Sequence, residues 1–215
     1  MPKDIVSTFR RVLDLNNFVV LDTETTGLEY PAEICQIALL DFMGNEIFNQ
    51  FVKTKRLIPS QATKIHGITN DMVASAPSWA DTHQQIIDLI SGKHVIVYNA
   101  VYDYKILSFT DKVSGLSSIN YSEIASFWCA MKFYSQYRGE RDDYHGNYRW
   151  HRLGDACRYE GIPVVGDHDA LGDCRLTYQL IRKVVSDMAA AEIAAAVPRD
   201  YDAEGGLSGG GSDGD

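Results

Sequence analysis

The amino-acid sequence predicts an α/β domain built on a mixed β-sheet. Two short apolar segments, 17–23 and His94–Tyr98, have the character of buried strands and end in polar residues. Two further strand-like segments, Glu33–Leu40 and Glu46–Phe51, flank a Met43–Asn45 turn, which is typical of an antiparallel hairpin. Later in the chain, strand and helix signals alternate as they do in parallel units. An antiparallel opening followed by alternating elements predicts a sheet that contains both kinds of pairing.

Helices are expected between and after these strands. Ser78 and Asp81 have the spacing of a capping box, which opens a helix that runs to about Ile90. Asn99 is a favourable N-cap for a helix that continues through about Phe109. The remaining expected helices are Ser122–Tyr137, Trp150–Glu160 and Asp169–Ala195.

Length and composition indicate one domain with short appendages. The 215 residues are 45% hydrophobic and 23% charged, which provides enough apolar side chains for a core. We expect a helical extension at 1–16, the domain at 17–197, and a flexible tail rich in Gly, Ser and Asp at 198–215. No apolar run approaches the ~20 residues of a membrane helix, and the first residues lack the apolar part of a signal peptide. Four scattered cysteines without a CxxC pair favour free thiols over zinc or disulfides, so we expect a cytoplasmic location.

The net charge of −9 does not decide whether the partner is a nucleic acid. From Asp187 onward, seven acidic residues and one arginine give a net charge of −6, so the rest of the chain carries −3. Cations held by carboxylates would cancel this remainder. Although phosphate binding usually requires a basic surface, the distribution of charge leaves the question open.

Four carboxylates occupy positions that the hydrophobic pattern assigns to the interior. Asp22 and Glu24 lie two residues apart at the end of an apolar strand and therefore project from the same face of the sheet. Asp103 follows Asn99 by one helical turn, and Asp173 lies on the apolar stripe of the last expected helix. Burying one unpaired carboxylate costs several kcal/mol, so converging acids require cations. Ligands that are all carboxylate oxygens favour Mg²⁺ or Mn²⁺ over zinc.

Taken in order, three motifs resemble the DEDDh branch of the DnaQ-like 3′→5′ exonucleases, which includes polymerase proofreading subunits and RNase T. The motifs are Leu21–Leu28, Tyr98–Asp103 and His168–Asp173, and the loop Ile65–Thr69 matches as well. The sister DEDDy branch has tyrosine four residues before the last acid, where this chain has Asp169, so the histidine variant fits. The resemblance covers roughly 17–185. It implies an RNase H-like fold, a mixed sheet of about five strands flanked by helices.

The resemblance also implies the roles of individual residues. Two divalent cations, Mg²⁺ or Mn²⁺, would activate a water and stabilise the oxygen that leaves the phosphodiester. Asp22, Glu24 and Asp173 would hold one cation, Asp22 would bridge to the second, and Asp103 would contribute through water. His168 would be the general base, since the ordinary pKa of histidine, near 6.5, suits proton transfer near neutrality. The residues expected to bind substrate are Thr23, Thr25, Gly27, Leu28, Gln61, His66 and Asn99.

Several of these residues also have plainer interpretations. His66 is equally explained as a packed loop histidine, and Asn99 as a helix cap. Gly27 is expected to let the backbone turn beside the substrate, and Thr23 and Thr25 to meet it with backbone or hydroxyl groups. The segment Met131–Tyr159 interleaves arginines with aromatic residues, which suits either single-strand stacking or local pairing within a solvated loop.

The sequence therefore predicts a metal-dependent exonuclease that releases nucleoside 5′-monophosphates from the 3′ ends of nucleic acid. Single-stranded DNA is the favoured substrate, and RNA is the second candidate. One alternative is a catalytically silent module that grips nucleic-acid ends. Another is a proofreading subunit that binds a polymerase, or another nucleic-acid-processing partner, through the tail from Pro198, although this tail lacks an apolar anchor. No membrane partner is expected.

Overall fold

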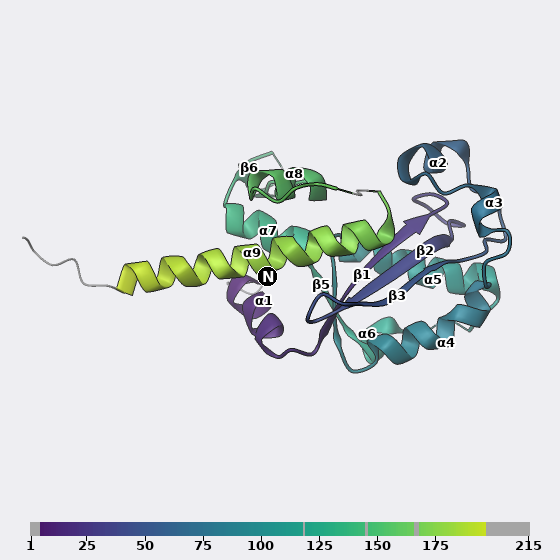
Figure 1. Ribbon diagram of the computed structural model, residues 1–215, viewed down its shortest axis with the longest axis horizontal. Coiled ribbons are helices and arrows are strands. Elements are labelled where there is room, and N and C mark those ends of the chain that lie inside the picture. The colour runs from purple at the N-terminus through teal and green to yellow at the C-terminus, as the bar shows by residue number, and fades with distance from the viewer. Residues whose placement is uncertain (1–4, 118, 145, 166–167, 197–215) are drawn as a thin grey trace, which may run out of the picture.

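A five-stranded mixed sheet forms the centre of the molecule (Figure 1). The computed structural model describes residues 5–117, 119–144, 146–165 and 168–196. The central strand β1 pairs antiparallel with β2 and parallel with β4, so the predicted mixed sheet is confirmed. The strands are β1 (Phe18–Thr25), β2 (Ile34–Asp41), β3 (Glu46–Phe51), β4 (His94–Val97) and β5 (Ser126–Cys129), in the order β3-β2-β1-β4-β5.

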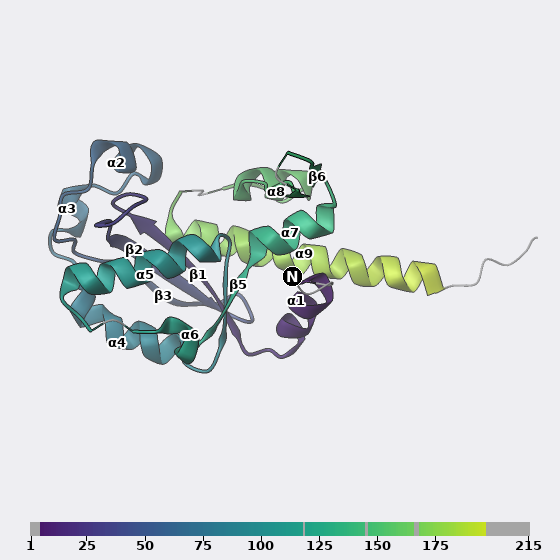
Figure 2. The same cartoon turned by 180° about the vertical axis from the view of Figure 1, so that it is seen from behind.

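Helices cover both faces of this sheet (Figures 1 and 2). One face is covered by α1 (Ile5–Asp14), α7 (Ala130–Arg138), α8 (Leu153–Tyr159) and α9 (Ala170–Ala196). The other face is covered by α4 (Trp79–Ile90), α5 (Ala100–Ser114) and α6 (Tyr121–Ile124). Smaller elements are α2 (Ser60–His66), α3 (Asn70–Val73) and a two-stranded sheet of β6 (Arg141–Asp142) and β7 (Asn147–Tyr148).

Alternate residues of β1 enter the two cores. Val20 belongs to the core under α9, whereas Leu21 belongs to the core under α5. Because side chains alternate along a strand, Asp22 and Glu24 continue the face that α9 covers, and Thr23 continues the face of α5. The two acids at the end of β1 are therefore directed toward the first turn of α9.

The hairpin between β2 and β3 forms at the predicted turn. Asp41 Oδ1 accepts hydrogen bonds from the backbone N–H groups of Met43 and Asn45 at 2.9 and 2.8 Å. Gly44 has a φ of 86°, and a Cβ at this position would lie 2.8 Å from the ring of Tyr178 on α9. Glycine is therefore needed both for the turn and for the close approach of the long helix.

The structure corrects two predicted helices. The segment expected to form one helix at Ser122–Tyr137 contains three elements, because α6 ends at Ile124, β5 follows, and α7 begins at Ala130. β5 pairs parallel with the buried strand β4 over its whole length. This tertiary pairing defines the strand, and the aromatic residues Phe127 and Trp128 suit it. The helix expected from Trp150 begins only at Leu153, which leaves the tryptophan outside it.

The first helix shares the core on the α9 face. Phe9 of α1 stacks on Phe133 of α7 with ring centroids 4.3 Å apart, and Arg10 pairs with Glu192 of α9 at 2.7 Å. The far end of α9 extends well past the sheet (Figure 1). Among the described helices, none combines the length and the apolar character that a membrane crossing requires. The tail predicted from Pro198 lies outside the described residues.

Candidate active site

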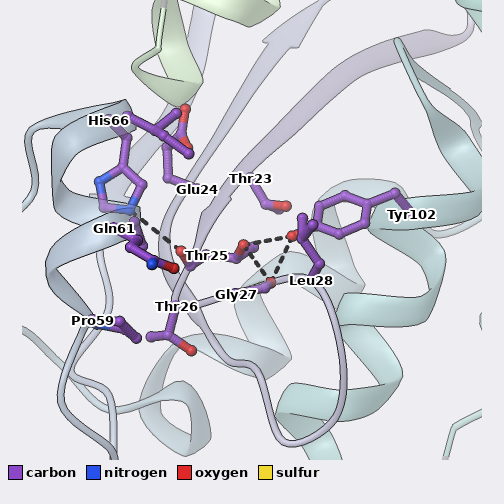
Figure 3. Close-up of a pocket in the computed structure, with 12 residues that line it drawn as sticks. Thr23, Glu24, Thr25, Thr26, Gly27, Leu28, Pro59, Gln61, His66 and Tyr102 are labelled. Atoms are coloured by element: carbon purple, nitrogen blue, oxygen red, sulfur yellow. Dashed lines mark hydrogen bonds between the residues drawn. The ribbon is translucent and has the colours of Figure 1, made fainter.

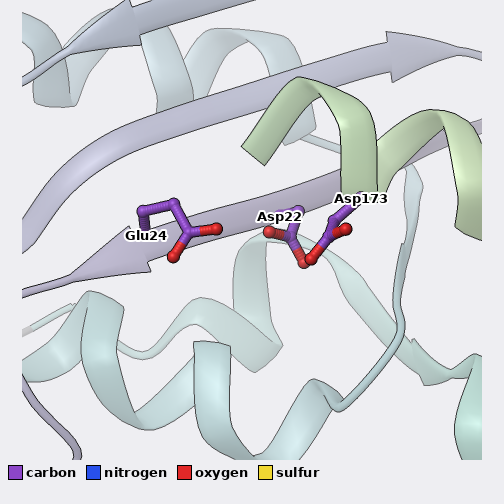
Figure 4. A group of neighbouring side chains, drawn as sticks. All are labelled: Asp22, Glu24 and Asp173. Carbon is purple, nitrogen blue, oxygen red and sulfur yellow. The ribbon is translucent and has the colours of Figure 1, made fainter. Parts of the chain in front are cut away.

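Three carboxylates from two elements meet near the end of β1 (Figure 4). Asp22 and Glu24 belong to β1, and Asp173 lies in the first turn of α9. One carboxylate oxygen from each residue lies within 4.8 Å of the others, and all three side chains are half-buried. A cation could be held by all three oxygens after small side-chain adjustments. The fold thus brings together acids from opposite ends of the domain sequence.

The fourth acid, Asp103, lies beside this group but is not part of it. Asp103 is in the first turn of α5, on the other face of the sheet, and is buried. Its Oδ1 accepts a hydrogen bond from Thr23 Oγ1 at 2.8 Å. The hydroxyl of Thr23, which we expected to meet substrate, is therefore engaged inside the protein, where it ties Asp103 to the strand that carries two of the other acids.

Burial and mutual repulsion make these acids difficult to ionise together. Burial, followed by the charges of Asp173 and Asp103, raises the pKa of Glu24 to about 8. Burial and the same neighbouring charges raise the pKa of Asp22 well above its ordinary range. Burial also raises the pKa of Asp103. An arrangement of carboxylates that repel one another in this way fits a divalent cation, whose charge would stabilise the ionised forms.

The start of α9 is anchored to the sheet by Gln36 of β2. Its Oε1 accepts the backbone N–H of Ala170 at 3.2 Å, and its Nε2 lies 3.5 Å from Oδ1 of Asp169. The same aspartate oxygen accepts the N–H of Leu171 at 3.0 Å. These bonds position the helical turn that carries Asp173. Our sequence reasoning did not identify Gln36, for which the available signal was a glutamine within an otherwise apolar strand.

His168 lies two residues before α9 and is exposed. Its φ of 66° lies in the left-handed region, which histidine adopts more readily than most residues. It lines the same cavity as Asp173 without belonging to the helix. His168 therefore borders the cavity that Asp173 also lines, on a backbone position that the helix does not constrain.

A cavity of about 520 Å³ opens beside Glu24 (Figure 3). It is formed by the end of β1, the turn that follows and α2, and Tyr102 of α5 contributes to its wall. Leu28 is 71% exposed at this cavity and offers an apolar surface. Of the residues predicted to bind substrate, those that line this cavity are Thr23, Thr25, Gly27, Leu28, Gln61 and His66.

The turn after β1 is held by Tyr102, which our sequence reasoning did not identify although it directly precedes Asp103. The Tyr102 hydroxyl donates to the carbonyl oxygen of Gly27 at 2.9 Å, and Thr25 Oγ1 donates to the same oxygen at 3.0 Å. The expected role of Gly27 is corrected, because its φ is not positive. A Cβ there would make only an ordinary contact with Ala32 at 3.9 Å, so the turn requires the carbonyl of Gly27 rather than conformational freedom.

His66 ties α2 to the end of β1. Its Nδ1 accepts the backbone N–H of Ile68 at 3.0 Å, so Nε2 carries the proton and points to the carbonyl oxygen of Thr25 at 3.3 Å. Burial lowers the pKa of His66, which favours the neutral ring that this pattern requires. These hydrogen bonds agree with a packed loop histidine, while the ring also borders the cavity.

A second cavity, of about 540 Å³, lies on the Asp173 side of the acids. His168 and Asn99 line it, so Asn99 is separated from the other residues that we expected to bind substrate. Asn99 occupies the N-cap position of α5, but its side chain forms no capping hydrogen bond, contrary to our expectation. Asn99 thus borders this second cavity without capping the helix through its side chain.

The segment in which arginines alternate with aromatic residues divides into two groups. Arg138 pairs with Glu140 at 2.7 Å, which is the local pairing considered as an alternative. Trp150, Arg152 and Arg158 line the second cavity, and Arg158 also pairs locally with Asp155 at 2.8 Å. The aromatic and arginine residues of the segment that line this cavity all come from its later part.

A family model and a curated relative that each match most of the chain are both described as exonucleases. The RNase T family model, described as exonuclease, matches residues 19–181. A protein of Escherichia phage 186 named uncharacterized exonuclease CP81 is 42% identical over 166 residues, which cover 76% of this chain and 85% of that protein. The DNA polymerase III subunit epsilon of Pasteurella multocida (strain Pm70) is 30% identical over 135 residues. That match covers 58% of this chain and 53% of the subunit, so the chain spans about half the length of this relative.

Solved structures with the same architecture include the nuclease domain of 3′hExo, described as a DEDDh family member bound to rAMP. It superposes with a TM-score of 0.65 at 17% identity, and the match covers 80% of this chain and 92% of that domain. At this identity the likeness concerns the fold, and it confirms the predicted RNase H-like sheet flanked by helices.

Proposed function

Because the chain belongs to the DnaQ-like exonuclease family and is an exonuclease, we propose that it acts on the 3′ ends of nucleic acid and releases nucleoside 5′-monophosphates. The observation that carries this proposal is the group formed by Asp22, Glu24 and Asp173, with a cavity on either side. Single-stranded DNA is the favoured substrate, since one relative is named as a DNA polymerase subunit. RNA is the second candidate, since a solved relative was bound to rAMP.

The proposed cofactors are two divalent cations, Mg²⁺ or Mn²⁺. Asp22, Glu24 and Asp173 offer only carboxylate oxygens, which hard cations prefer. When bound, such cations polarise a phosphodiester and lower the pKa of water. Asp103, held by Thr23, would add negative charge from the other face of the sheet.

The remaining roles follow from the positions of the two cavities. The first cavity would take the terminal nucleoside, with the exposed Leu28 against the base and Gln61 as a polar contact. His168 would accept a proton from the attacking water, because it is exposed and lines the same cavity as Asp173. Because His168 lies outside α9, its imidazole could change position while the carboxylate of Asp173 stays fixed on the helix.

A proofreading subunit bound to a polymerase is a second candidate, favoured by the similarity to an epsilon subunit. In this case the tail from Pro198 would carry the contact with the polymerase or another nucleic-acid-processing partner. Purification of the full chain from its host with a polymerase attached would support this role. Loss of that association on removal of the tail would identify the contact, whereas purification without any polymerase would count against it.

The central test is the degradation of matched single-stranded DNA, RNA and duplex DNA, each labelled at either end, with Mg²⁺ and with Mn²⁺. We expect stepwise shortening from the 3′ end and release of 5′-mononucleotides. Asp22→Ala should lower kcat by about a thousandfold or more, because cation binding contributes several kcal/mol to the transition state. Asp14→Ala, an exposed acid on α1, is the matched control and should retain full activity.

Two outcomes would contradict the proposal. Full activity of Asp22→Ala would show that the carboxylate group is not the active site. Tight binding of 3′ ends by the wild type without turnover in either cation would identify a silent end-binding module instead.

A further inference from the structure

The second cavity combines an exposed aromatic ring with positive charge beside the acids. Trp150 is 61% exposed, and Arg152 and Arg158 are exposed as well. All three line the cavity that also contains His168 and Asp173. A large indole exposed to water next to guanidinium groups is typical of surfaces on which single-stranded nucleic acid stacks.

The backbone that carries this ring is held firmly by the residue between Trp150 and Arg152. His151 is buried, and its carbonyl oxygen accepts a hydrogen bond from the Tyr98 hydroxyl at 2.7 Å. Its ring packs edge-on against Tyr134 with centroids 5.6 Å apart. Trp150 and Arg152, on either side of this histidine, both line the cavity. The tryptophan and the arginine are therefore presented together toward the cavity.

The two cavities meet at the acids. Glu24 lines the first cavity and Asp173 lines the second, and their carboxylate oxygens lie within 4.8 Å of each other. A strand whose terminal nucleoside fills the first cavity would place its scissile phosphate at the acids. The next nucleotides on the 5′ side would then have to continue into the second cavity.

Charge supports the same path for the strand. The acids repel phosphates, so a strand that crosses them needs positive charge on its far side. Arg158 forms an exposed ion pair with Asp155, which lines the same cavity, at 2.8 Å. Arg152 directly precedes α8 and adds a second guanidinium group to the wall of the same cavity. Two arginines near the cavity can therefore hold the backbone where the acids cannot.

We propose that the second cavity binds the nucleotides on the 5′ side of the scissile phosphate, with a base stacked on Trp150 and phosphates bound by Arg152 and Arg158. The proposal rests on the proposed exonuclease function. It assigns the preference for single strands to the tryptophan, because a base inside a duplex already has both faces stacked. Stacking on an indole tolerates any base. This site would therefore select single strands over duplexes with little preference among base sequences.

The test compares an oligonucleotide with the p-nitrophenyl ester of thymidine 5′-monophosphate, whose 5′ phosphate carries p-nitrophenol in place of a further nucleotide. Trp150→Ala should raise KM for single-stranded DNA about tenfold, the size expected for the loss of one base stack. It should leave kcat/KM for the ester unchanged, and Trp150→Phe should restore most of the affinity. Tyr144→Ala, an aromatic residue that is 92% exposed in the neighbouring loop, is the matched control.

Binding measured without turnover separates this inference from the proposed function. In an Asp22→Asn background, fluorescence anisotropy should show about tenfold weaker binding of single-stranded DNA after Trp150→Ala. Arg152→Ala should reduce the slope of log K against log salt by about 0.7 for each phosphate that is no longer neutralised, and Arg182→Ala on α9 should not. If the wild type hydrolyses neither substrate, the proposed function fails while the binding result still decides the subsite. Equal reductions in activity on oligonucleotide and ester, or unchanged binding, would overturn the subsite.

Discussion

Glu24 shows how a single residue of the site opposes folding when no cation is bound. Its pKa rises from an ordinary value of 4.5 to about 8, through burial and then through the neighbouring acids. A carboxyl with a higher pKa in the folded state binds its proton more tightly there than in the unfolded chain. Its ionisation therefore destabilises the fold progressively as the pH rises from about 4.5 towards 8.

Glu24→Gln should consequently stabilise the cation-free protein at high pH alone. The glutamine keeps the size of the side chain and removes the charge, so the gain should be fully present at pH 8.5 and absent near pH 4.5. After allowance for solvent screening of a half-buried group, we expect about 1 kcal/mol, or roughly 2–4 °C in the thermal unfolding midpoint. Thermal unfolding in EDTA across this range, with the exposed Glu29→Gln as control, measures the effect. An equal shift at both pH values would contradict the repulsion.

At the scale of elements, the position of α9 relative to β2 determines whether Asp173 reaches the other acids. Gln36 holds this junction through Ala170 and Asp169 and lines neither of the two cavities, so we treat it as a positioning residue. Gln36→Leu would keep a similar volume but leave buried polar groups of the helix start without this partner. We expect a loss of about 1–3 kcal/mol in the free energy of unfolding.

The same substitution should also weaken cation binding without affecting the first cavity. Loss of a residue that orients a ligand typically costs about 10–100-fold in metal affinity, so the Mg²⁺ concentration for half-maximal activity should rise by about that factor. KM for the nucleotide ester at saturating Mg²⁺ should stay near the wild-type value. Gln85→Leu on α4 provides an exposed glutamine as control. A variant that loses stability while its Mg²⁺ requirement is unchanged would show that Gln36 is merely structural.

The elements also show which parts of the fold local sequence can predict. Ser78 and Asp81 form the predicted capping box, since both partners are only three residues apart. β5 was missed because its four residues become a strand only through pairing with β4, a partner that local patterns do not reveal. Tyr102 and Gln36 were missed for a similar reason, because their hydrogen-bond partners lie far away in the sequence. The acids themselves were predictable because charge at apolar positions is visible without knowledge of the fold.

At the scale of the whole molecule, the carboxylate group exists only when β1 and α9 are folded against each other. The unfolded chain cannot hold Asp22 and Asp173 together, so any cation that binds this group must stabilise the fold by mass action. Mg²⁺ at about 100 times its dissociation constant should add roughly 2.7 kcal/mol to the free energy of unfolding. Because Glu24 has its pKa raised to about 8, cations compete with protons, and the gain should be larger at pH 8.5 than at pH 6.

Thermal unfolding with MgCl₂, and with KCl at the same ionic strength, distinguishes this linkage from a general effect of salt. We expect the unfolding midpoint to rise with Mg²⁺ and to return to its original value with EDTA, while KCl leaves it nearly unchanged. Asp22→Asn should abolish most of the rise, because it removes one of the three carboxylates from the group. A rise of the same size in the Asp22→Asn variant would place the cation elsewhere in the molecule. The absence of any rise at pH 8.5 would mean that these acids do not hold Mg²⁺ in the folded chain.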